Sequence, residues 1–198
     1  INFGFEDRSP LFNQTNYTIV DSRNKQYTSN NPLEPENFGT AVIEDHSIAK
    51  LNIDVRIRFG QQYLNYPDKK INIPNEHYPS LYLGYEKGFA SSDRSNHYGQ
   101  FKIRAAHAFQ VSNKGNFSYN VRAGTFINGE DISFVDYQHF NGNESYVTRK
   151  SYTQSFLLLP YYSFSTNKQY MEGHLEHNFN GFVLNRIPIL KHINAHLI

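Results

Sequence analysis

The stretch LNIDVRIRFG at residues 51–60 alternates apolar and polar side chains along its length. Successive side chains of a β-strand point to opposite faces, so this period of two is typical of a strand with one apolar and one polar face. Helical periodicity is hard to find, and the sequence therefore predicts an all-β fold of about eight strands. The further strand candidates are residues 1–6, 80–89, 101–111, 117–127, 139–148, 155–164, 170–179 and 193–198.

Composition excludes several protein classes. The 198 residues include no cysteine, which rules out a disulfide-stapled domain and any cysteine-ligated metal. Aromatic residues make up 16% of the chain, whereas disordered chains are poor in them. The net charge of +1 gives no reason to expect a nucleic-acid partner. A membrane-spanning helix needs about 20 mostly apolar residues, and no such run occurs.

The clearest hairpin joins residues 101–111 to residues 117–127. The linking residues SNKGN place Gly115 where a turn can use a positive φ. Each arm has about the 9–11 residues that a tilted membrane-spanning strand requires. By contrast, the connections at 7–47 and 61–77 are long and polar, as they are on one rim of transmembrane barrels.

Two architectures produce alternating strands. In a soluble sandwich the apolar faces pack against each other, whereas in an outer-membrane barrel they face lipid and the polar faces line the lumen. Soluble strands usually have about 5–6 residues, and several runs here have ten or more. This length favours an antiparallel meander that forms part of a transmembrane outer-membrane β-barrel. Interfacial aromatic girdles would then be supplied by Phe59, Tyr78, Phe89, Tyr98, Tyr161 and Tyr162.

In this barrel each strand assigns its side chains to lipid or to the lumen. The residues expected to face lipid are Leu51, Ile53, Val55, Ile57, Phe101, Ile103, Phe117, Tyr119 and Val121. The residues expected to line a lumen of mixed charge are Asp54, Arg56, Arg58, Lys102, Arg104, Arg122, His174 and Glu176.

Both ends of the sequence also read as strand, INFGF at the start and INAHLI at the end. We therefore expect residues 1–198 to be a segment of one outer-membrane β-barrel domain, cut inside a sheet at both ends. Because a barrel leaves no sheet edge exposed to lipid, strands from elsewhere would complete it.

No motif predicts catalysis or a bound metal. In HLEH at residues 174–177, His174 and Glu176 would share one face of a strand while His177 points to the other, which is too few ligands for a tetrahedral site. Glu130, Asp131 and Asp136 lack the spacing of a calcium loop, although a loop site remains a weak alternative. We expect no enzyme, no cofactor and no metal.

Several stretches resemble a known family. YMEGHLEHNFNGFVLNRIPIL is the most specific, and EDRSPLFNQTNY, YPSLYLGYEKGF and DYQHFNGNESY are similar to other parts of the same family. It is a Gram-negative outer-membrane barrel family whose members often carry an N-terminal carboxypeptidase-like regulatory domain. It distantly resembles the surface-antigen superfamily, which includes barrel-assembly insertases and two-partner secretion transporters.

Members of that superfamily keep a Val-Arg-Gly-Phe or Val-Arg-Gly-Tyr tetrapeptide on a loop folded into the barrel. The corresponding region here is 146–166, where YVTRKSY has an arginine, Arg149, but no glycine after it. The resemblance implies that Arg149 reaches into the lumen; a solvated loop residue is the alternative.

The resemblance also implies a location and a role. We expect a protein of the Gram-negative outer membrane that acts in outer-membrane protein biogenesis, secretion or surface display. Its partners would be outer-membrane lipid and other outer-membrane or periplasmic proteins. The alternatives are a structural or receptor barrel that anchors such partners, or a barrel-embedded lipid hydrolase, for which Ser155 and His174 are among many candidate residues.

Overall fold

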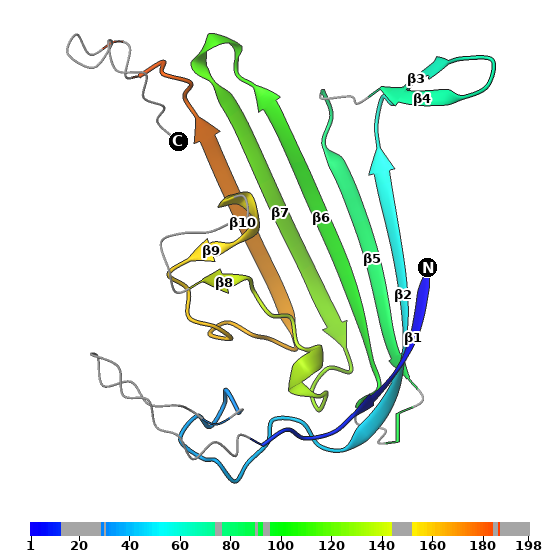
Figure 1. Cartoon of the computed structure of the whole chain (residues 1–198), viewed down its shortest axis with the longest axis vertical. Helices are drawn as coiled ribbons and strands as arrows, with labels where there is room; N and C mark the ends of the chain where they lie inside the picture. The colour runs from blue at the N-terminus through cyan, green and yellow to red at the C-terminus, as the bar shows by residue number, and fades with distance from the viewer. Residues whose placement is uncertain are drawn as a thin grey trace.

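The computed structural model describes residues 1–12, 29, 31–73, 77–89, 91–92, 96–143, 152–183 and 186. The chain is all-β, and its main feature is a six-stranded antiparallel sheet in the order β1-β2-β5-β6-β7-β10 (Figure 1). Apart from the excursions between β2 and β5 and between β7 and β10, neighbours in the sheet are neighbours in the sequence. The strands are β1 (Asn2–Arg8), β2 (His46–Arg58), β5 (Ser80–Phe89), β6 (Tyr98–Gln110), β7 (Asn116–Ile127) and β10 (Gln169–Asn178). The predicted all-β antiparallel meander is thereby confirmed.

The smaller elements lie in the two excursions. A hairpin of β3 (Gln62–Asn65) and β4 (Lys70–Ile73) stands off the main sheet beyond β2 (Figure 1). The predicted strands at 139–148 and 155–164 are wrong in their described parts, which contain only β8 (Gly142–Asn143) and β9 (Phe156–Leu157), paired in parallel. The candidate at 193–198 lies outside the described residues.

Short 3-10 helices complete the fold. They are η2 (Ser112–Lys114), η3 (Phe134–Asp136) and η4 (Tyr152–Gln154). None of the helices in the described ranges has the length and apolar character needed to cross a membrane.

The hairpin of β6 and β7 confirms the predicted turn. Gly115 adopts a φ of 113°, a value that side chains other than glycine rarely tolerate. The Val111 amide donates a hydrogen bond to the Gly115 carbonyl at 2.8 Å, which closes the turn. This turn fixes the pairing of the two strands from Gly99 opposite Ile127 to Gln110 opposite Asn116.

The strand register separates the side chains cleanly onto two faces. Directly opposed residues share a face, so one row of the apolar face runs Ile53–Tyr85–Phe101–Thr125–Gln169 across the sheet and the next runs Val55–Leu83–Ile103–Ala123–Met171. All the residues predicted to face lipid belong to this apolar face. All those predicted for the lumen belong to the opposite, polar face.

Large side chains of the apolar face are exposed, whereas part of the polar face is buried. On the apolar face Ile103 is 50% exposed and Leu175 is 71% exposed. On the polar face Tyr98 and Ile48 are 0% exposed, and Glu172 is 6% exposed. The prediction that Tyr98 belongs to an interfacial girdle is therefore wrong, because its ring is buried against the polar face.

The cover of the polar face is the connection between β7 and β10. We call residues 128–168 the covering loop; its described parts are 128–143 and 152–168. It carries η3, β8, β9 and η4, and η4 contacts both β7 and β10 (Figure 1). Ile132 of this loop forms the small buried core with Ile48 and Tyr98. The chain thus folds its own loop over the polar face and leaves the apolar face uncovered in the described residues.

Candidate functional site

The polar face carries a line of guanidinium groups across its middle. The arginine row consists of Arg56 on β2, Tyr82 on β5, Arg104 on β6, Arg122 on β7 and Glu172 on β10, each opposite the next. Like charges directly opposite each other destabilise a sheet, so the Arg104–Arg122 pair requires compensation.

Each arginine of that pair has a different compensating partner. Arg122 forms an ion pair with Glu172, whose side chain is only 3% exposed. Arg104 instead donates from Nε to the Oδ1 of Asn120 at 2.7 Å, and Asn120 donates in turn to the Thr153 carbonyl of η4 at 2.6 Å. The covering loop therefore contributes to holding the arginine row in place.

Tyr82 lies between two guanidinium groups. The Cζ of Arg56 is 5.0 Å from the centre of its ring, and the Cζ of Arg104 is 4.9 Å from it. Both distances are within the range of cation–π attraction. Within the described ranges, neither Arg56 nor Arg104 has a carboxylate at ion-pair distance. These two arginines thus keep their charge unneutralised beside an aromatic ring.

The row next to the arginine row contains the other charged residues of the sheet centre. It runs Asp54–Gly84–Lys102–Gly124–Tyr170. Lys102 pairs with Glu86 at 2.9 Å, and the Tyr98 hydroxyl donates to the same carboxylate. The ring of Tyr170 lies over Gly124, where a Cβ would approach it to 2.5 Å. Gly124 is therefore needed for this close approach.

A cavity of about 310 Å³ opens between these two rows. Gln138 of the covering loop contributes to its lining, together with Tyr170. Its polar and charged lining is Asp54, Arg56, Tyr82, Lys102, Arg104, Arg122, Gln138 and Tyr170.

The remaining predicted lumen residues lie towards the β6–β7 turn. Arg58 lies at the exposed end of β2, in the row that ends at His174 on β10. Glu176 lies one row further, opposite Ser118. Arg149 lies outside the described residues.

The ring of His174 packs against an aromatic side chain. Its ring centre is 4.4 Å from that of Phe156 in β9, and its Nε2 is 3.7 Å from Glu172 Oε1, beyond hydrogen-bond distance. Ser155 is also buried, next to Phe156. Among the described residues, no group of three or more histidine, aspartate or glutamate side chains is placed to hold a metal ion.

Asp136 of η3 anchors the covering loop to the sheet. Arg8 donates to both of its carboxylate oxygens at 2.7 and 2.9 Å, and Lys50 lies 2.6 Å from its Oδ1. Burial of the carboxyl raises its pKa, but the hydrogen bonds and charges of Arg8 and Lys50 outweigh burial and hold the pKa below its ordinary value. The alternative that Asp136 binds calcium is corrected, because two protein cations occupy its carboxylate.

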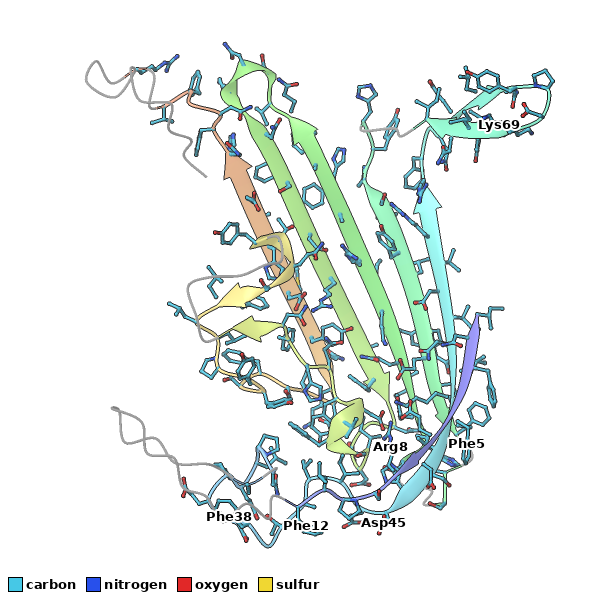
Figure 2. The ribbon with its side chains drawn as sticks, in the orientation of Figure 1. Phe5, Arg8, Phe12, Phe38, Asp45 and Lys69 are labelled. Carbon is cyan, nitrogen blue, oxygen red and sulfur yellow. The ribbon has the colours of Figure 1, made fainter. Side chains whose placement is uncertain are left out.

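Sequence reasoning missed this anchor. Arg8 lies at the end of β1, near the covering loop and at the opposite end of the sheet from Lys69 in the β3–β4 hairpin (Figure 2). Arg8 and Asp136 are 128 positions apart, and no local motif links them.

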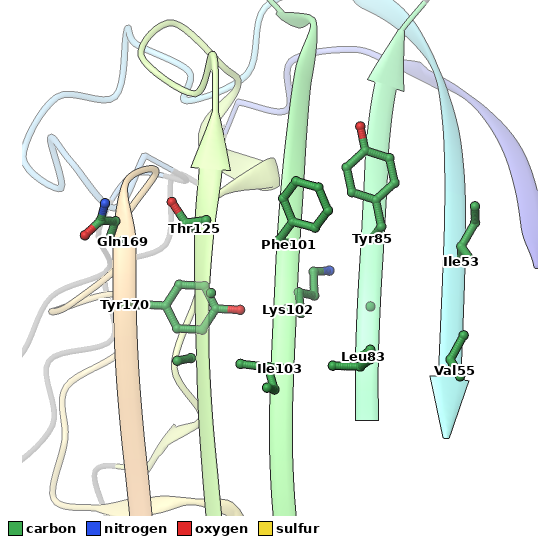
Figure 3. Close-up of a pocket in the computed structure, with 13 residues that line it drawn as sticks. Ile53, Val55, Leu83, Tyr85, Phe101, Lys102, Ile103, Thr125, Gln169 and Tyr170 are labelled. Atoms are coloured by element: carbon green, nitrogen blue, oxygen red, sulfur yellow. The ribbon is translucent and has the colours of Figure 1, made fainter. Parts of the chain in front are cut away.

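The apolar face has a shallow groove of its own. It has a volume of about 680 Å³ and crosses the sheet from β2 to β10. Figure 3 shows Ile53, Tyr85 and Phe101 in one row, with Val55, Leu83 and Ile103 in the next. No segment among the described residues covers it with a second layer of sheet or helix (Figure 1).

Comparison with known protein families gives a match that extends over the whole chain. No curated protein and no solved structure matches the sequence. The match is to a family described as the C-terminal domain of a family of unknown function (DUF5686), and it covers residues 1–198. The chain therefore belongs to the DUF5686 family and forms its C-terminal domain.

Proposed function

We propose that this chain forms part of the wall of a transmembrane β-barrel in the outer membrane of a Gram-negative bacterium. Its apolar face contacts lipid and its polar face lines the lumen, into which the covering loop folds. The observation that carries the proposal is the exposure of large apolar side chains on one face of the sheet: Ile103 is half exposed, whereas Tyr98 on the polar face is fully buried.

The energetics of the apolar face support lipid as its surroundings. Keeping a large apolar side chain in water forgoes about 1.5–3 kcal/mol. Six such side chains on this face therefore forgo roughly 10 kcal/mol, which is comparable to the whole net stability of a folded domain. Hydrocarbon around the sheet removes this penalty. The six are Val55, Leu83, Phe101, Ile103, Met171 and Leu175, all 42–75% exposed.

The dimensions of the strands fit a bilayer. β6 has 13 residues, which at a rise of about 3.4 Å each extend about 44 Å. At the roughly 45° tilt of barrel strands this length spans about 31 Å, close to the hydrocarbon thickness of about 30 Å. Aromatic side chains lie at both ends of the apolar face, Phe109 opposite Phe117 at one and Phe5 in line with Phe89 at the other. This arrangement matches interfacial girdles.

The connections support an orientation for the barrel. The long connections at 9–45 and 128–168 leave one end of the sheet, and the tight turn at 111–115 closes the other. The connection at 59–79, expected on the same rim as 7–47, leaves the end with the tight turn and carries the β3–β4 hairpin. Outer-membrane barrels have long loops outside the cell and short turns in the periplasm. The covering loop therefore enters the lumen from the cell surface.

Within such a barrel the role we propose is the assembly, secretion or surface display of other proteins. Among the described residues, β1 and β10 each pair with one neighbour in the main sheet, so each leaves an edge at which a further strand could pair. Sheet edges template incoming strands, which is a physical route to inserting a client. The resemblance to the surface-antigen superfamily points the same way, although the Val-Arg-Gly-Phe tetrapeptide is missing from this sequence.

A structural or receptor barrel is the second candidate, and the β3–β4 hairpin favours it. Its residues Tyr63, Leu64 and Ile71 are 43–57% exposed although they are apolar. Under the proposed orientation the hairpin extends into the periplasm, where a partner protein would cover it.

Reconstitution separates the two roles. Full-length protein is placed in liposomes, and the folding rate of an unfolded outer-membrane client is compared with that in empty liposomes and in liposomes bearing an unrelated barrel. Acceleration above both controls supports the assembly role. A rate equal to the controls overturns it and leaves the receptor role, which binding of periplasmic proteins to wild type but not to a Leu64→Asp variant would support.

A further inference from the structure

The cavity beside the arginine row has the charge pattern of a site for an anion. Its lining brings four cationic side chains together, from β2, β6 and β7. Lys102 and Arg122 are each paired with a carboxylate, Glu86 and Glu172. Arg56 and Arg104 have no such partner within the part of the chain that the structure describes.

One carboxylate in the lining opposes this charge without cancelling it. Asp54 lies in the neighbouring row, and its Oδ1 is about 3.0 Å from the position that a Cβ on Gly84 would occupy. The carboxylate therefore lies over the glycine of β5. The cavity thus keeps a surplus of positive charge at Arg56 and Arg104.

The fold holds Arg104 in position as a charged group beside a second arginine. Arg104 is directly opposite Arg122 on the neighbouring strand, which is unfavourable for like charges. Arg104 is also held in position, by Asn120 at 2.7 Å and by the Tyr82 ring. A group that is both charged and pre-positioned binds an anion with little loss of side-chain freedom.

We propose that this cavity binds a small oxyanion of the phosphate or carboxylate class, held by Arg56 and Arg104. The planar guanidinium offers paired N–H donors that match two oxygens of such a group. Tyr82, Tyr170 and Gln138 provide further polar groups in the lining. The cavity volume of about 310 Å³ lies at the lower end of the range for ligand pockets, which limits the ligand to a small molecule or a single head group.

The inference concerns the polar face alone and does not depend on what covers the apolar face. Its failure and the failure of the proposed function are therefore distinguishable. A phosphate could come from solution or from a lipid head group, and the experiment has an arm for each source.

The test is a titration of the purified full-length protein in uncharged detergent, at physiological salt. Inorganic phosphate, acetate and micelles doped with phosphatidylglycerol are the three probes, and isothermal calorimetry measures the affinity. Arg104→Gln and Arg56→Gln remove the proposed ligands. Arg58→Gln is the matched control, because it removes the same charge from the same face of β2, outside the cavity lining.

We expect saturable binding of at least one probe. Each ligand variant should weaken it by about tenfold or more, as expected for a lost hydrogen bond to a charged group. The control should change it by less than either ligand variant does, because Arg58 does not line the cavity. Binding only of the doped micelles assigns the site to a lipid phosphate.

Two results would overturn the proposal. One is the absence of saturable binding for all three probes. The other is an equal loss of affinity in Arg58→Gln and Arg104→Gln. That result would indicate that the anion is attracted by the general positive charge of the polar face rather than bound at a defined site. Arg56 is exposed and its printed hydrogen bond, to Ser80, is 3.4 Å long, so its variant remains informative if the Arg104 variant fails to fold.

Discussion

Arg8 and Asp136 form a two-point ion pair, with Nη1 donating to Oδ2 at 2.7 Å and Nη2 donating to Oδ1 at 2.9 Å. The pair joins β1, at one edge of the sheet, to the loop that leaves β7 near the other edge. The Asp136 side chain is 0% exposed and that of Arg8 is 8% exposed. The covering loop is thus attached to the sheet edge through a buried charge.

Removing this carboxylate should detach the loop. Asp136→Asn leaves Arg8 and Lys50 without their main partner, and breaking one side of a buried ion pair typically costs about 3–5 kcal/mol. Urea unfolding should show a loss of this size. Asp131→Asn, an exposed neighbour in the same loop, should stay within about 0.5 kcal/mol. Equal losses of unfolding free energy in the two variants would show that Asp136 does not anchor the loop.

Acid should weaken the ion pair of Asp136 with Arg8 over a defined pH range. The folded-state pKa of Asp136 lies below its ordinary value of 3.8. A depressed carboxyl pKa stabilises the fold above that value, and the stabilisation is lost as pH falls through the folded pKa. Stability measured from pH 6 to pH 2 should therefore fall more steeply in wild type than in Asp136→Asn. Parallel curves below pH 4 would contradict the assignment.

Protonation of His139 should affect the stability of the fold over a separate and higher pH range. Burial lowers its pKa below the ordinary 6.5, although the Phe134 carbonyl and Asp136 partly oppose this. The unfolded chain then takes up a proton first, so stability should decline as pH falls below about 6.5. His139→Gln should remove this upper decline in a pH series and leave the lower one in place. A curve unchanged above pH 5 would show that His139 does not contribute.

The contact of Tyr170 with Gly124 predicts a size-dependent interaction. A Cβ at position 124 would lie 2.5 Å from the ring, so Gly124→Ala should destabilise the fold by about 1–3 kcal/mol. Adding Tyr170→Ala should recover part of this loss in a double-mutant cycle of unfolding free energies. Gly4→Ala is the control, because nothing lies within 4 Å of its added Cβ. Strictly additive effects would argue against the contact.

A charge on the apolar face should be costly in a bilayer. Ile103→Lys places an ammonium group at the centre of β6, where a lipid-facing lysine costs about 2–4 kcal/mol at mid-membrane. Folding into lipid vesicles, followed by denaturant titration, measures this cost. Leu64→Lys, in the hairpin outside the main sheet, should be nearly neutral. A neutral Ile103→Lys would mean that this face meets water.

The alternation of apolar and polar residues predicted the long strands because the surroundings of each strand face stay the same along most of its length. β5 has the predicted bounds of 80–89, and the turn at Gly115 was also predicted. The pattern fails where the covering loop meets the sheet, because Ile48 and Tyr98 are apolar residues on the polar face and pack against Ile132. β2 and β6 therefore begin earlier than alternation alone predicts.

The covering loop itself could not be predicted as a loop. The pattern of its apolar residues is similar to that of a strand. In the structure they pack as an aromatic cluster in which Phe134, His139 and Tyr162 are in contact. The β3–β4 hairpin was missed, although Pro67 and Asp68 between two short strand-forming runs are a turn signal. The charged residues of the site were predicted by face, but their alignment into the arginine row depends on strand register, which single strands do not encode.

Nitroxide accessibility along β6 shows whether lipid, water or protein surrounds the apolar face. The chain has no cysteine, so single cysteines placed at positions 101–106 and spin-labelled in proteoliposomes report on their own surroundings. If the apolar face contacts lipid, access of dissolved oxygen should peak at 101, 103 and 105, and access of a water-soluble nickel complex at 102, 104 and 106. Access of the nickel complex at 101, 103 and 105, or protection of these positions from both reagents, would show that the apolar face does not contact lipid.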